Sequence, residues 1–189
     1  YVPHPLYDSP EITWSHPEKI TVKAATDADL TLDLTYPGGV TGTLEFEGQA
    51  PGRFSALWKP AQDATSIAYF RLRPRASAEE GFYGLGEYFD HVNHRGQVRA
   101  MQIEIDGGVE SGYNEAHVPV PFLTGTTGWG LFVASERPGA FAVAAGAADP
   151  DLIEAAFGTG EASGEGLRFH LFGAAHPLAP ALEIAEEAL

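Results

Sequence analysis

The first part of the chain alternates between apolar and polar residues with a period of two. Leu30, Leu32 and Leu34 are separated by single polar residues, and Ile20 and Val22 flank a threonine. In a β-strand, successive side chains point to opposite faces. Each segment is therefore predicted to be a strand that buries its leucine, isoleucine or valine side and exposes the other side to water.

Similar short segments, separated by turn residues, continue along most of the chain. Residues 36–39 (Tyr-Pro-Gly-Gly) predict a turn after the second strand, because glycine tolerates positive φ. About a dozen short strands predict an antiparallel β-sandwich and argue against alternating βα units. Beyond the first two, the expected strands cover residues 43–46, 54–58, 67–72, 82–86, 98–105, 118–123, 129–134, 141–145, 152–157 and 167–172.

The last residues follow a different period. Leu182, Ala185 and Leu189 recur at helical spacing, with glutamates between them. We therefore expect a sandwich domain over residues 1–176 and a short helix over residues 177–189. This helical pattern ends without a glycine or asparagine stop signal, which favours a natural polypeptide that continues further.

Composition narrows the class of protein. The 189 residues suffice for one domain with a sizeable core, since 44% are hydrophobic and 11% aromatic. The formal charge of -15 disfavours nucleic acid and anionic membranes as partners. The absence of cysteine excludes disulfides, a thiolate metal site and a cysteine nucleophile. None of these properties defines the cellular location.

Polar side chains are concentrated between residues 87 and 122. Carboxylates, amides and arginine bind pairs of sugar hydroxyls, and aromatic rings stack on the C–H face of a sugar. The segment therefore has suitable chemistry for a carbohydrate, although loops are polar for many other reasons. Its polar members are Asp90, His91, Asn93, His94, Arg95, Gln102, Glu104, Asp106, Glu110, Asn114, Glu115 and His117.

Two sharper interpretations of this segment are disfavoured. Paired carboxylates cleave glycosides, but Glu104, Asp106 and Glu110 also suit a solvated loop. The spacing of His91 and His94 resembles a metal site but lacks a fixed third ligand. We therefore expect no catalytic residue, no metal site and no cofactor in this chain.

Four short motifs stand in a distinctive order. They are residues 82–87 (Phe-Tyr-Gly-Leu-Gly-Glu), 93–96 (Asn-His-Arg-Gly), 121–122 (Pro-Phe) and 128–132 (Gly-Trp-Gly-Leu-Phe). In order and spacing they resemble the amino-terminal sandwich domain of glycoside hydrolase family 31, which includes α-glucosidases and α-xylosidases. The resemblance implies a galactose-mutarotase-like antiparallel β-sandwich.

The family's activity is the cleavage of α-glycosidic bonds with retention, by an aspartate nucleophile and an aspartate acid/base. Both acids lie in a (β/α)8 barrel, which typically needs about 250 residues and for which this chain has no room. The resemblance thus implies a non-catalytic domain whose partners are a carbohydrate substrate and the barrel of the same parent protein.

In that family the sandwich sends a loop towards the barrel's pocket, and the corresponding stretch here is residues 101–117. The resemblance places substrate contacts at Gln102, Glu104, Asn114, Glu115 and His117. Many members carry Asn-x-Asp where this chain has Gln-Ile-Glu at 102–104, so the sugar stays undefined.

Two other functions remain open at this stage. A free-standing carbohydrate-binding module would bind sugar by itself, without a barrel. An aldose epimerase of similar sandwich fold would need a histidine and a carboxylate converging on one sheet face. His117 and His170 are the histidines placed on expected strands or at their edges.

Overall fold

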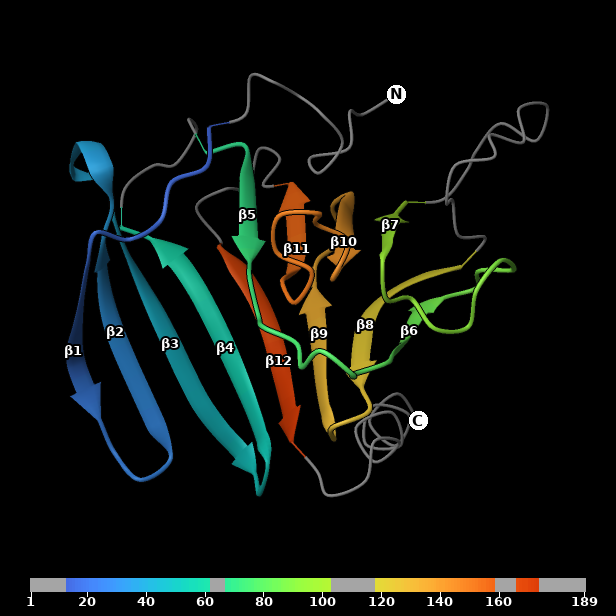
Figure 1. The fold of residues 1–189 in the computed structure, drawn as a ribbon. Coiled ribbons are helices and arrows are strands. Elements are labelled where there is room, and N and C mark those ends of the chain that lie inside the picture. Colours follow the sequence, from blue (N-terminus) through green and yellow to red (C-terminus); the bar gives the residue numbers. More distant parts are fainter. Residues whose placement is uncertain (1–12, 62–66, 103–117, 159–165, 174–189) are drawn as a thin grey trace.

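The computed structural model describes residues 13–61, 67–102, 118–158 and 166–173. These residues form two antiparallel sheets that pack as a β-sandwich (Figure 1). The predicted all-β fold with two antiparallel sheets is thereby confirmed. The helix expected at 177–189, and with it the domain boundary at 176, lies outside the described residues.

The larger sheet contains eight of the described strands. Its last strand in the sequence, β12, inserts between β4 and β9 and so joins the early strands to the later ones. In spatial order the strands are β1 (Lys19–Ala25), β2 (Asp29–Thr35), β3 (Thr41–Ala50), β4 (Arg53–Pro60), β12 (Leu167–Gly173), β9 (Trp129–Ala134), β8 (Pro119–Gly125) and β6 (Phe82–Gly86).

The smaller sheet contains four of the described strands. Their spatial order is β5 (Tyr69–Leu72), β11 (Ile153–Gly158), β10 (Gly139–Val143) and β7 (Gln97–Met101). In Figure 1 this sheet stands in front of the β12, β9 and β8 part of the larger sheet. No described helix is both long enough and apolar enough to cross a membrane.

The predicted turn at residues 36–39 is present. A short 3-10 segment, η1 (Pro37–Gly39), connects β2 to β3. Gly38 and Gly39 adopt φ values of 76° and 80°, which glycine adopts without the steric cost of a Cβ. The three amino-terminal strands therefore form a continuous antiparallel meander.

The hydrophobic core lies between the two sheets. Phe141 on β10 and Phe157 on β11 are fully buried, and their rings meet edge to face with centroids 5.8 Å apart. Trp129 packs at the margin of this core, as its position on an apolar strand predicts. Other fully or almost fully buried members are Phe82, Leu85, Leu123, Leu131, Val133, Val143, Ile153 and Ala155.

The burial predicted for β1 is wrong. Ile20 is 58% exposed and Val22 is 65% exposed, although both lie opposite apolar residues of β2, namely Leu34 and Leu32. Directly opposed residues of an antiparallel pair share a face, so the pattern did place these side chains on the core side of the sheet. They are exposed because β1 is the edge strand of the larger sheet and no described residue of the core cluster packs against it.

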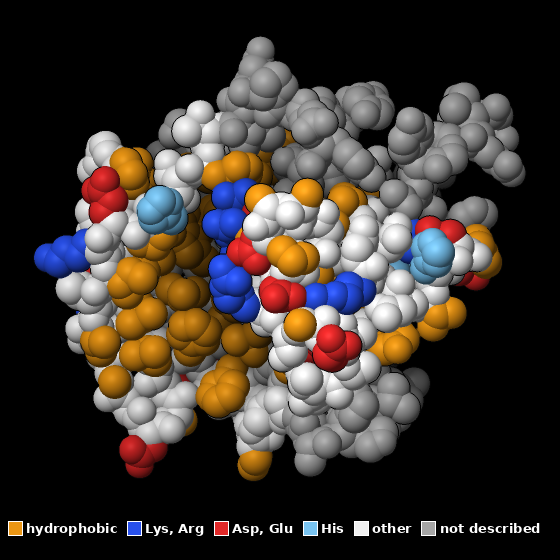
Figure 2. Space-filling model, viewed as in Figure 1, with side chains coloured by type: hydrophobic (Ala, Val, Ile, Leu, Met, Phe, Trp, Pro, Cys, Tyr) orange, Lys and Arg blue, Asp and Glu red, His pale blue; other side chains and the backbone are white. Residues whose placement is uncertain are grey.

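The uncovered surface forms one continuous apolar area, which we call the open face. Figure 2 shows it as a hollowed area of hydrophobic side chains over the amino-terminal strands. Cross-strand pairing aligns Leu32 with Leu44 and Leu30 with Phe46, so β2 and β3 contribute to the same face as β1. The open face comprises Ile20, Val22, Leu30, Leu32, Leu44 and Phe46, of which Leu44 and Phe46 also pack against the core.

Candidate functional site

The glycine-spaced motif at 82–87 has a structural explanation. Gly84 and Gly86 have φ values of 108° and 96°. A Cβ on Gly84 would lie 2.3 Å from the carbonyl oxygen of Phe122, and a Cβ on Gly86 would lie 1.9 Å from the carbonyl oxygen of Val118. The pairing of β6 with β8 shifts register between these two glycines. Leu85, between them, has φ of 63° and is fully buried. The glycines thus let β6 approach β8 closely while Leu85 enters the core.

The motif at 93–96 binds back to the first residues of β6. Asn93 Oδ1 accepts hydrogen bonds from the backbone N–H of Phe82 at 3.1 Å and of Arg95 at 3.0 Å. The His94 N–H donates to the Phe82 carbonyl at 2.9 Å. Asn93 therefore closes the loop that follows β6.

Arg95 connects this loop to two other segments. Its Nη1 donates to the carbonyl oxygens of Ser77 and Glu80 at 3.0 and 3.1 Å. Its Nη2 donates to the Pro150 carbonyl at 3.2 Å and to Asp151 Oδ1 at 2.7 Å. A guanidinium with this many partners inside the protein is a brace rather than a ligand-binding group.

The motif at 128–132 is anchored by Glu80, which the sequence analysis did not single out. Glu80 is 4% exposed. Its Oε1 accepts from the indole N–H of Trp129 at 2.6 Å and from Thr127 Oγ1 at 2.5 Å, and its Oε2 accepts from the Ser77 N–H at 3.1 Å. No local pattern around residue 80 indicated these partners, because two of them lie more than forty positions later.

A polar cluster around a buried arginine links the loop after β6 to β7. Arg99 is fully buried, and its Nη1 and Nη2 each donate to an oxygen of Asp90 at 2.9 Å. Its guanidinium lies 4.4 Å from the ring centroid of Tyr88, whose hydroxyl donates to the Ala100 carbonyl at 2.7 Å. We call Tyr88, Asp90, His94 and Arg99 the Arg99 cluster.

The same cluster fixes the tautomer of His94. Arg99 Nε donates to His94 Nδ1 at 3.1 Å, so Nδ1 is unprotonated and Nε2 carries the proton that bonds to the Gly84 carbonyl at 2.9 Å. Burial, and then the Arg99 charge, lower the pKa of His94, whereas the Arg99 hydrogen bonds lower the pKa of the Asp90 carboxyl. Both effects favour neutral imidazole beside an ionised carboxylate.

These contacts decide how the polar segment should be interpreted. Asp90, Asn93, His94 and Arg95 bond within the protein, so this part of the segment holds the fold rather than a sugar. His94 engages both ring nitrogens internally. In the described ranges, no three His, Asp or Glu side chains are grouped in a way that suits a metal ion.

The predicted substrate-binding residues are only partly described. Gln102 follows directly after the last residue of β7 and is half-buried. The other four, Glu104, Asn114, Glu115 and His117, lie outside the described residues, so their roles stay predictions. The 101–117 stretch leaves the smaller sheet at β7, and the chain re-enters the larger sheet at β8.

The structure describes His170, one of the two histidines considered for an epimerase. It belongs to β12, between Phe169 and Leu171, both of which contact the core, so its side chain points to the opposite face of the sheet. There it stacks on Phe132, with ring centroids 5.9 Å apart, and it is paired across the strands with Ser55. His117 lies outside the described residues.

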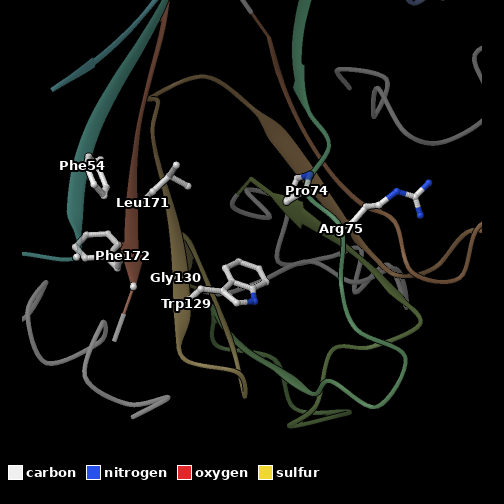
Figure 3. A pocket seen from close by; sticks show the side chains of 9 residues that line it. Phe54, Pro74, Arg75, Trp129, Gly130, Leu171 and Phe172 are labelled. Atoms are coloured by element: carbon white, nitrogen blue, oxygen red, sulfur yellow. The ribbon is translucent and has the colours of Figure 1, made fainter. Parts of the chain in front are cut away.

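Among the described residues, two of the cavities adjoin the larger sheet. The first has a volume of about 430 Å3 and lies where β12 ends and where β4 and β9 begin (Figure 3). Phe54, Leu171 and Trp129 line it, while the Arg75 side chain points away and forms two bonds to Asp149, at 2.8 and 3.3 Å. This cavity is therefore apolar and offers few hydrogen-bonding groups.

The second cavity, about 650 Å3 in volume, lies among residues 13–17, the turn after β2, and β5. We call it the aromatic cleft. It differs from the first cavity because aromatic rings and guanidinium groups line it together. The residues of the aromatic cleft that matter below are Trp14, Tyr36, Trp58, Tyr69, Arg71 and Arg73.

Comparison with known proteins gives the class of fold. No protein-family model and no curated protein matches the chain. Solved structures do match, and they place the fold among antiparallel β-sandwich domains that occur within much longer chains. One is an uncharacterised protein of Listeria monocytogenes in complex with glucose, with a TM-score of 0.68 and 13% identity over 86% of this chain.

Two further matches are sugar-acting enzymes. A family 31 sulfoquinovosidase from E. rectale gives a TM-score of 0.54 at 18% identity over 82% of this chain. A cycloalternan-degrading enzyme from Trueperella pyogenes gives 0.53 at 18% identity over 85%. The chain spans only 21%, 23% and 25% of these three proteins. At such identities the likeness establishes the fold.

Proposed function

We propose that this chain is the non-catalytic amino-terminal domain of a family 31 α-glycosidase. The observation that carries the proposal is the match of nearly the whole chain to about a quarter of a family 31 enzyme. The sequence motifs support it as well. The motifs at 82–87, 93–96 and 121–122 contact one another around β6 through hydrogen bonds and strand pairing.

The proposed role of the domain is to brace the barrel and to shape its substrate pocket through the 101–117 stretch. The Arg99 cluster supports this role, because it fixes the end of β7 from which that stretch departs. Gln102, Glu104, Asn114, Glu115 and His117 are the proposed contacts to a carbohydrate. A loop that starts from a rigid strand end positions its polar groups more precisely than one that starts from another loop.

Five of the described carboxylates are bonded to other groups of the protein, which supports a structural role for them. Asp90, Asp149, Asp151 and Glu154 form ion pairs with arginines, and Glu80 accepts three hydrogen bonds. A retaining glycosidase needs two carboxyl groups about 5 Å apart that flank the scissile bond. The proposed source of both acids is the barrel of the parent protein.

Hydrolysis of aryl α-glucosides and aryl α-xylosides tests this function. The chain by itself should release no aryl alcohol, whereas the natural polypeptide that includes the downstream region should release it. Within that longer polypeptide, Asn114→Ala or Glu115→Ala should raise KM more than it lowers kcat, since these groups bind substrate without taking part in bond cleavage. Robust turnover by the chain alone would refute the proposal.

A further inference from the structure

The aromatic cleft shares no residue with the Arg99 cluster, yet its rings are fixed by several contacts. The Trp58 indole N–H donates to the Tyr36 hydroxyl oxygen at 2.7 Å, and the Trp58 ring packs on Phe70 with centroids 4.4 Å apart. The Arg71 guanidinium lies 4.0 Å from the ring centroid of Trp14. Rings held in this way lose little conformational entropy when a ligand binds.

Hydrogen-bonding groups stand beside these rings. Tyr36 accepts from the indole, so its own proton is left to donate to a ligand, and burial raises the pKa of Tyr36, which keeps that proton in place. Arg73 bonds to Glu154 Oε1 through Nε at 3.1 Å, and its side chain is 51% exposed, so part of the guanidinium is accessible to a ligand. Arg71 bonds to the same carboxylate oxygen at 2.9 Å.

The combination of aromatic rings with hydrogen-bond donors disfavours both purely apolar ligands and anions. A purely apolar ligand would strip water from the Arg73 and Tyr36 donors without replacing it, which is costly. An anion would gain from two arginines that share one carboxylate, but it would approach a molecule with a formal charge of -15. A neutral sugar offers both an apolar C–H face for an aromatic ring and hydroxyl pairs for a guanidinium.

We infer that the aromatic cleft is a binding site for a neutral oligosaccharide, separate from the catalytic pocket of the proposed enzyme. A volume of about 650 Å3 lies within the range of small-ligand sites, about 300–1,000 Å3. Tyr69 and Trp14 supply the stacking surfaces, and Arg73 and Tyr36 donate to hydroxyl groups. The apolar cavity beside Phe54 lacks such hydrogen-bond donors, so it serves as the negative control for sugar binding.

The three tryptophans of the chain make the test specific. Trp14 and Trp58 line the cleft, whereas Trp129 lines the apolar cavity. The 15N-labelled chain is titrated with maltotriose or isomaltotriose, with glycerol as a polyol that has no ring, and the three indole N–H signals are followed by NMR. The expected result is a saturable shift of the Trp14 and Trp58 signals with a trisaccharide, an unmoved Trp129 signal, and no shift with glycerol.

Two matched pairs of substitutions locate the binding. Tyr69→Ala and Arg73→Ala should each weaken trisaccharide binding about tenfold or more. Arg75→Ala and Phe54→Ala, which remove an exposed arginine and an exposed aromatic ring outside the cleft, should leave binding unchanged. The backbone spectrum of each variant shows whether the fold is retained.

Three results with the chain alone would overturn the inference. They are no shift with either trisaccharide, equal shifts at all three indoles, or shifts that Tyr69→Ala and Arg73→Ala leave unchanged. If the Trp14 and Trp58 signals of the longer natural polypeptide are already displaced and do not respond to sugar, the cleft is a protein–protein contact instead. Turnover of a small aryl glycoside does not need the cleft, so the proposed function survives each of these results.

Discussion

On β9, Leu131 and Val133 are 2% and 0% exposed, whereas on β1, Ile20 and Val22 are 58% and 65% exposed. All four lie on the same side of one eight-stranded sheet, in which β1 is an edge strand and contributes no residue to the core cluster. Alternation along the chain therefore determines which side chains share a face. Whether that face is dry depends on how far the second sheet extends.

The half of the larger sheet that the smaller sheet covers and the open half around β1 also differ in their polar contacts. On the covered half, Asp90 pairs with a fully buried arginine. On the open half, Lys23 and Asp33 pair across β1 and β2 at 3.7 Å, with side chains 58% and 49% exposed. Water screens the second pair strongly and the first one only in part. The halves thus offer matched pairs of residues on which the comparison can be tested.

A large loss of stability is expected for the glycine at the β6–β8 contact. Gly86→Ala places a methyl group against the Val118 carbonyl at a positive φ and should destabilise the fold by at least about 3 kcal/mol. Gly39→Ala, also at positive φ but with no atom within 4 Å, should cost only the backbone term, about 1–2 kcal/mol. Urea unfolding monitored by circular dichroism measures both variants. Equal losses would show that the β6–β8 contact is not tight.

Truncation of a leucine or isoleucine tests burial directly. Leu131→Ala should lower the free energy of unfolding by about 2–5 kcal/mol, because it removes buried methyl groups and leaves a cavity. Ile20→Ala should change it by only about 0.5 kcal/mol. A loss for Ile20→Ala that approaches the loss for Leu131→Ala would mean that the open face is covered in solution.

Charge neutralisation gives an intermediate difference. Asp90→Asn leaves the Arg99 charge buried without its carboxylate and should cost about 1–3 kcal/mol, a value reduced because the Asp90 side chain is 46% exposed. Asp33→Asn removes an exposed pair and should cost about 0.5 kcal/mol or less. Thermal unfolding of the two variants at equal ionic strength supplies the comparison.

Acidification should weaken the covered half through His94. The pKa of His94 is lowered in the folded state, so protons bind the unfolded chain more tightly once the pH falls below about 6.5. The contribution of His94 is complete above that pH and is lost progressively as the pH decreases towards the folded pKa. The free energy of unfolding is measured against pH for the unchanged chain and for His94→Gln, between neutral and weakly acidic pH. Equal slopes of the two curves would show that His94 is not responsible. We expect the variant to be flatter in that window.

The smallest effect on stability is expected on the open face. Ile20→Thr combined with Val22→Thr should change the free energy of unfolding by about 0.5 kcal/mol or less per site. The same double variant should bind less of a dye that reports exposed apolar surface, because continuous apolar patches attract such ligands. Unchanged dye fluorescence would contradict the exposure of this face.

The sequence analysis recovered the strands and the class of fold because each depends on a local pattern. Leu30, Leu32 and Leu34 define a strand by themselves, and residues 36–39 define the turn that follows it. The position of β12 between β4 and β9 depends on pairing between residues more than a hundred positions apart, such as His170 and Ser55. No local pattern contains that information.

The candidate site was recovered only in part, for the same reason. The motifs at 82–87 and 93–96 were identified, but the partners of Asp90 and Arg95, namely Arg99 and Asp151, come from other segments of the chain. The aromatic cleft went unnoticed because Trp14, Tyr36 and Tyr69 come from three separate segments. Glu104, Asn114, Glu115 and His117 stay predictions.

The central claim is that this domain frames a catalytic pocket whose acids belong to another domain. The most direct measurement compares aryl α-glycoside hydrolysis by the 189-residue chain with hydrolysis by the natural polypeptide that includes its downstream region. The account predicts no turnover by the chain and retaining α-glycosidase activity by the longer protein. Turnover by the chain alone, or a longer protein that lacks any α-glycosidase activity, would contradict it.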